Sequence, residues 1–80
     1  MSETTTPRTV SDLHRRIHAG DCFRSDFRHY TLFFFFVETV GAVCHLVDAS
    51  GDEHTGPAGD DQLKAAISNG IEPIERDEIP

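Results

Sequence analysis

Four side chains of types that bind transition metals fall between residues 14 and 44: His14, His18, Cys22 and Cys44. His14 and His18 are four positions apart, a spacing that places two imidazoles one turn apart on the same face of a helix. With Cys22 and with a thiolate from Cys44, they would supply the four ligands of a tetrahedral zinc site. Because Gly20 is expected to end the helix before Cys22, the competing interpretation is two solvated histidines and two small apolar thiols. We expect no cofactor other than this alternative zinc ion.

A cysteine nucleophile is not predicted. Cys44 and His45 are adjacent in a predicted strand, so their side chains point to opposite faces and cannot hydrogen-bond to each other. The sequence has no glycine-rich nucleophile turn, no phosphate-binding loop and no twelve-residue calcium loop. Two cysteines in a chain without a signal sequence argue against a disulfide framework. We therefore predict that the protein is not an enzyme.

The basic residues concentrate in the first third of the chain. Residues 1–29 hold five Arg against four acids, whereas residues 30–80 hold two basic groups against ten acids. The predicted contact surface comprises Arg15, Arg16, Arg24, Arg28 and Tyr30. Arg can bind phosphates and Tyr can stack on bases, so a nucleic-acid-binding regulator is one alternative. The other is that these arginines pair with the protein's own acids.

The overall charge is strongly acidic, with a formal net charge of −7. Six of the seven basic residues are Arg, and this composition resembles that of proteins from salt-loving archaea. In molar salt the Debye length falls to about 3 Å, so repulsion among carboxylates is screened. The alternative is an ordinary acidic cytosolic protein.

Neither the first residues of the chain nor its longest apolar run suggests a membrane protein. The first nine residues lack the apolar stretch of a signal sequence. The apolar run from Leu32 to Val37 is much shorter than the roughly 20 residues that span a bilayer. We therefore expect a cytoplasmic protein without a membrane partner.

The segment Tyr30–Val37 is the element around which the chain is built. Four consecutive Phe residues fit a strand, and alternation then gives it two apolar faces. A chain of 80 residues has little left to cover both. We therefore predict a homodimer through one face, carried by Phe33, Phe35 and Val37; the alternative is that helices from both ends of the chain cover both faces.

The remaining patterns predict an α+β fold. Val10, Leu13 and Ile17 share one face of a helix over about residues 11–19, and Leu63, Ala66 and Ile67 share one face of a second helix. Between the helices we expect an antiparallel meander of three or four strands, which could bend strongly like a small SH3-type barrel, and after the second helix a terminal extended segment. The predicted domains are a disordered tail at 1–9, one domain at 10–76 and an acidic tail at 77–80.

Together these features predict a small non-catalytic binding protein, homodimeric through its aromatic sheet, that also contacts a protein partner.

Overall fold

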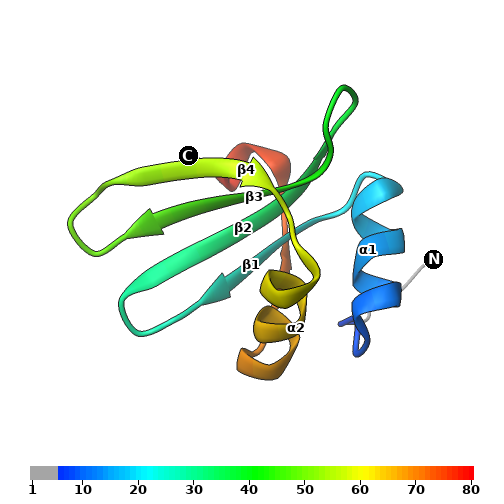
Figure 1. The fold of residues 1–80 in the computed structure, drawn as a ribbon, viewed down its shortest axis with the longest axis horizontal. Helices are drawn as coiled ribbons and strands as arrows, with labels where there is room; N and C mark the ends of the chain where they lie inside the picture. Colours follow the sequence, from blue (N-terminus) through cyan, green and yellow to red (C-terminus); the bar gives the residue numbers. More distant parts are fainter. Residues whose placement is uncertain (1–5) are drawn as a thin grey trace.

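A five-stranded antiparallel sheet with two helices on one side makes up residues 6–80, the part of the chain that this computed structural model describes (Figure 1). The predicted α+β class and the order helix, strands, helix are confirmed. The elements are α1 (Val10–His18), β1 (Cys22–Asp26), β2 (Tyr30–Val37), β3 (Gly41–Asp48), β4 (Glu53–Pro57), α2 (Asp60–Asn69), β5 (Glu72–Ile74) and a 3-10 helix η1 (Arg76–Glu78).

The strand order is β4-β3-β2-β1-β5, with every neighbouring pair antiparallel. The meander thus has four strands, and the terminal extended segment adds a fifth beside β1. In residues 6–80 no pairing joins β4 to β5, so the sheet is open and does not close into the SH3-type barrel that we considered.

The central position of β2 explains its composition. Phe34 pairs with Phe23 on β1 and with Cys44 on β3, and all three side chains face the helices. Phe33 is the preceding residue and points to the opposite face of the sheet. We call these two surfaces the helix-covered face and the helix-free face.

Helix α1 begins where the side chain of Thr9 accepts a hydrogen bond from the Asp12 N–H, 3.1 Å away. It ends before Gly20, whose φ of +107° lies in the region that glycine adopts most easily. The apolar side chains of both helices are buried against the sheet. The core consists of Leu13, Ile17, Phe23, Leu32, Phe34, Ala42, Cys44, Leu63 and Ala66.

The end of α2 is tied to β1 by polar groups. The Ser25 hydroxyl, which is 1 % exposed, donates to the Gly70 carbonyl at 2.7 Å. The Asn69 amide donates to the Ser25 hydroxyl at 2.9 Å and to the Asp26 carbonyl at 2.7 Å. These bonds satisfy buried polar groups between two elements that are distant in sequence.

Ordered structure extends into both of the segments that we expected to be tails. Pro7 is buried, so chain before residue 10 packs against the fold, while residues 1–5 of the expected tail lie outside the described residues. Residues 76–78 form η1 with exposed side chains, and Ile79 is half-buried. Hence residues 75–80, which we call the 75–80 segment, belong to the folded structure.

Candidate interaction surface

The helix-free face has an apolar centre made by alternate residues of β2 and β3. Its members are Phe33, Phe35, Val37, Val43 and Val47. Phe33 is only 7 % exposed and Val43 only 2 %, whereas Phe35, Val37 and Val47 are half-buried. Phe33, predicted as an interface residue, is therefore already covered by its own chain, while Phe35 and Val37 keep accessible surface.

The 75–80 segment supplies part of this cover. The Arg76 guanidinium carbon lies 4.9 Å from the centre of the Phe35 ring, within the range of a cation–π contact. An Arg76 N–H also donates to the carbonyl of Phe36 at 3.4 Å. Figure 1 shows the segment, in red, on the other side of the strands from α2.

One rim of the helix-free face is an ion-pair cluster at the β1–β5 side. Arg24 contacts the carboxylates of Asp26 at 2.9 Å and Glu72 at 3.3 Å. Thr31 donates to Asp26 at 3.0 Å. The Nε of Arg24 is buried and lacks a hydrogen-bond partner among the described residues, which leaves this rim incompletely satisfied.

The opposite rim is a hydrogen-bonded chain between β3 and β4. His45, 8 % exposed, contacts the Glu53 carboxylate through Nε2 at 2.8 Å and the Thr55 hydroxyl through Nδ1 at 2.5 Å. A carboxylate can only accept, so in a neutral imidazole Nε2 carries the proton, Nδ1 accepts, and the Thr55 hydroxyl donates.

Carboxylate, imidazole and hydroxyl in this order are also the groups of a hydrolase triad. Here Thr55 is the direct cross-strand partner of His45 in the ladder. These hydrogen bonds therefore help to fix the register of β3 and β4, and they satisfy the ring nitrogens of a buried histidine. The sequence did not predict this hydrogen-bonded chain, although the strong turn signal around Ser50 lies five residues from both His45 and Thr55.

The predicted arginine surface does not form one patch. Arg15 and Arg16 lie on α1, where they pair with Asp12 and Asp21 respectively. Arg24 lies on the helix-free face, paired as described above. Three of the four arginines thus contact the protein's own acids, which is the alternative we set against a nucleic-acid surface.

Arg28 lies in the β1–β2 turn, and Tyr30 lies beside it at the start of β2. Tyr30 is 36 % exposed and stacks on Phe27 with ring centres 4.9 Å apart. Within residues 6–80, Arg28 forms no hydrogen bond or ion pair. A shallow depression of about 230 Å³ borders these residues, and Asp48 lies in its wall, where its carboxylate would repel a phosphate.

The four predicted zinc ligands are not brought together. His14 and His18 do lie together, with ring centres 4.4 Å apart, and the His18 ring lies 5.1 Å from that of Phe36. Cys22 pairs with Ile74 on the helix-free face, whereas Cys44 is in the core on the other face. No group of three or more His, Cys, Asp or Glu side chains suited to a metal occurs in residues 6–80.

Both cysteines are free and buried. Burial raises the pKa of the Cys44 thiol to about 11 and also raises that of Cys22, where Arg76 opposes the shift. Cys44 and His45 point to opposite faces, as the strand pattern predicted. These thiols are protonated at neutral pH and make poor nucleophiles.

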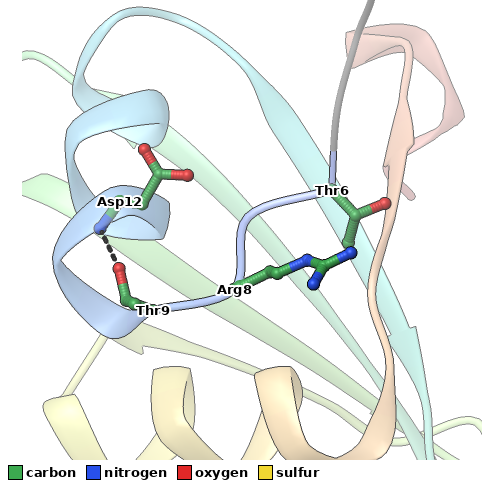
Figure 2. A pocket seen from close by; sticks show the side chains of 4 residues that line it. All are labelled: Thr6, Arg8, Thr9 and Asp12. Carbon is green, nitrogen blue, oxygen red and sulfur yellow. Dashed lines mark hydrogen bonds between the residues drawn. The ribbon is translucent and has the colours of Figure 1, made fainter.

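An open depression of about 580 Å³ lies at the start of α1, lined by Thr6, Arg8, Thr9 and Asp12 (Figure 2). Asp12 pairs with Arg15 rather than with Arg8, and Arg8 has no ion pair in the described part of the chain. The depression combines one exposed cation with a helix terminus, which by itself does not define a binding site.

Comparison with protein-family models, with curated proteins and with solved structures finds no match. Within residues 6–80, neither helix has the length and apolar content needed to cross a membrane.

Replacing Thr55 with Val tests the hydrogen-bonded rim. The change leaves Nδ1 of the buried His45 without a partner, so we expect unfolding free energy to fall by about 1–3 kcal/mol. Thr31→Val is the matched control on the same face, where the lost bond to exposed Asp26 should cost less than about 1 kcal/mol. Urea unfolding at neutral pH measures both; equal losses would contradict a structural role for the rim.

The raised pKa of the Cys44 thiol predicts that the protein loses stability at alkaline pH. Between its ordinary pKa of 9.0 and its folded value of about 11, the unfolded chain releases a proton that the folded chain keeps. The stabilisation is complete below pH 9 and is lost as pH rises to 11, by about 2 kcal/mol. Urea unfolding at pH 8 and 11 should show a clear drop in the wild type and in Cys22→Ala, and a smaller drop in Cys44→Ala, where only the raised pKa of Cys22 remains. A drop of equal size in Cys44→Ala would refute the assignment.

Proposed function

We propose that this is a non-catalytic binding protein that forms a homodimer through the helix-free face of its sheet. The observation that carries the proposal is that both helices cover one face of β2, while the other face keeps Phe35, Val37 and Val47 partly accessible. Burying such side chains fully contributes roughly 1.5–3 kcal/mol each relative to full exposure, so each gains a part of that in a complex.

The layout of the face supports a protein partner. An apolar centre flanked by hydrogen-bonded polar rims is the usual organisation of a protein interface. A two-fold dimer pairs the same patch on both subunits, so the apolar centre of one copy would lie against that of the other. Two antiparallel sheets can pack in this way with their inner faces about 10 Å apart.

The acidic composition supports a salt-rich cytoplasm as the setting. Two chains of net charge −7 repel each other in dilute buffer. Salt near 1 M reduces the Debye length to about 3 Å, which removes most of that repulsion. Association is therefore expected to strengthen as salt rises.

The salt response also separates the dimer from the nucleic-acid alternative, because binding through arginine–phosphate contacts weakens as salt rises. That alternative has lost its continuous surface, since its arginines lie on α1, on the helix-free face and in the β1–β2 turn. The dimer proposal is therefore the better supported of the two.

Replacing Val37 with Asp tests the interface. Sedimentation of the wild type at roughly 2 M KCl, where charges are screened, should show a dimer, and Val37→Asp should shift the protein to monomer because it places a charge in the apolar contact. Val40→Asp is the matched control: it makes the same change at a residue that is 52 % exposed in the β2–β3 turn.

Circular dichroism checks that both variants remain folded. A wild type that stays monomeric from roughly 1 µM to 1 mM, the range of weak to moderate affinity, would end the proposal. So would equal dissociation of the two variants.

A further inference from the structure

The helix-free face already has an occupant, the 75–80 segment, and its attachment is slight. The hydrogen bonds of the segment's backbone are internal: Glu75 N–H donates to the Glu78 carboxylate at 2.7 Å, and Ile79 N–H to the Arg76 carbonyl at 3.2 Å. η1 can therefore leave the sheet without losing those bonds.

The polar and cation–π contacts that join the segment to the sheet come from one side chain. Arg76 lies over the ring of Phe35 at 4.9 Å and donates to the Phe36 carbonyl at a long 3.4 Å. A cation–π contact near the surface corresponds to roughly a 2- to 5-fold change in an equilibrium constant. Ile79 is half-buried, while Asp77 and Glu78 remain exposed.

The chain before the segment is anchored more firmly. β5 pairs with three consecutive residues of β1, Cys22 to Arg24, and Glu72 contacts Arg24. The boundary between the paired strand and the weakly held segment lies between Ile74 and Glu75. Lifting residues 75–80 at this boundary would leave the five-stranded sheet intact.

We propose that the 75–80 segment is a releasable cover that competes with a second copy of the chain for the helix-free face. This inference rests on the proposed homodimer and adds its regulation: the closed segment weakens dimer formation, and its release exposes Phe35 with the apolar side chains beside it. A binding-competent state that is only partly populated weakens the apparent affinity in proportion to its population.

The competition has a quantitative consequence for Arg76→Ala. Losing the Arg76 contact raises the ratio of open to closed segment by roughly 2- to 5-fold. Because both subunits must be open to pair, the apparent dimer dissociation constant should fall by the square of that factor, about 4- to 25-fold. A stop after Ile74, which removes the cover altogether, should strengthen association at least as much.

Sedimentation in high salt compares four proteins: the wild type, Arg76→Ala, the chain ending at Ile74, and the control Arg8→Ala. Arg8 is exposed and distant from the helix-free face. Arg8→Ala removes one positive charge, as Arg76→Ala does. Tighter association of Arg76→Ala, with Arg8→Ala unchanged from the wild type, is the expected result. Should the chain ending at Ile74 fail to fold, the two point variants decide the question.

The contrary outcomes separate the two proposals. If all folded proteins dimerise with one dissociation constant, the cover is refuted and the dimer stands. If Arg76→Ala associates more weakly than Arg8→Ala, the segment is part of the interface and does not compete with it. If every protein stays monomeric, the dimer itself is refuted and the competition with it.

Discussion

The double-sided apolar character of β2 is the constraint on which the rest of the structure depends. A central strand with four consecutive Phe residues needs cover above and below the sheet. The buried faces of α1 and α2 pack on Phe34 and the residues around it. A chain of 80 residues has little more to offer for the other face. That face is covered in part by the short 75–80 segment, whose cation is Arg76.

This division of cover explains the character of the helix-free face. Its centre is apolar, because it belongs to β2 and β3. Its edges are polar, because β4 and β5 are the outer strands and β1, beside β5, carries Arg24 and Asp26. Arg24 with its two acids holds one edge, and His45 with Glu53 and Thr55 holds the other. The same arrangement that keeps an incompletely covered sheet folded also gives it the layout of a binding surface.

The sequence predicted those features that depend on local pattern. Three local patterns are confirmed: the strand period of Tyr30–Val37, the helical period of Leu13 and Ile17, and Gly20 as the end of a helix. It could not predict contacts made across long separations. Arg76 meets Phe35 across some forty residues, and a short run rich in acids was therefore interpreted as a solvated tail. The alternative of a zinc site also depended on distant contacts, and face alternation separates Cys22 from Cys44.

The most direct test of this account is the position of Arg76 in solution, measured by proton NMR on the monomer at low concentration. A side chain stacked over the Phe35 ring should give nuclear Overhauser contacts between the two residues, and its side-chain methylene protons should shift upfield through the ring current. Random-coil shifts for Arg76 and Ile79, without contacts to Phe35, would contradict the claim that the chain covers both faces of its central strand.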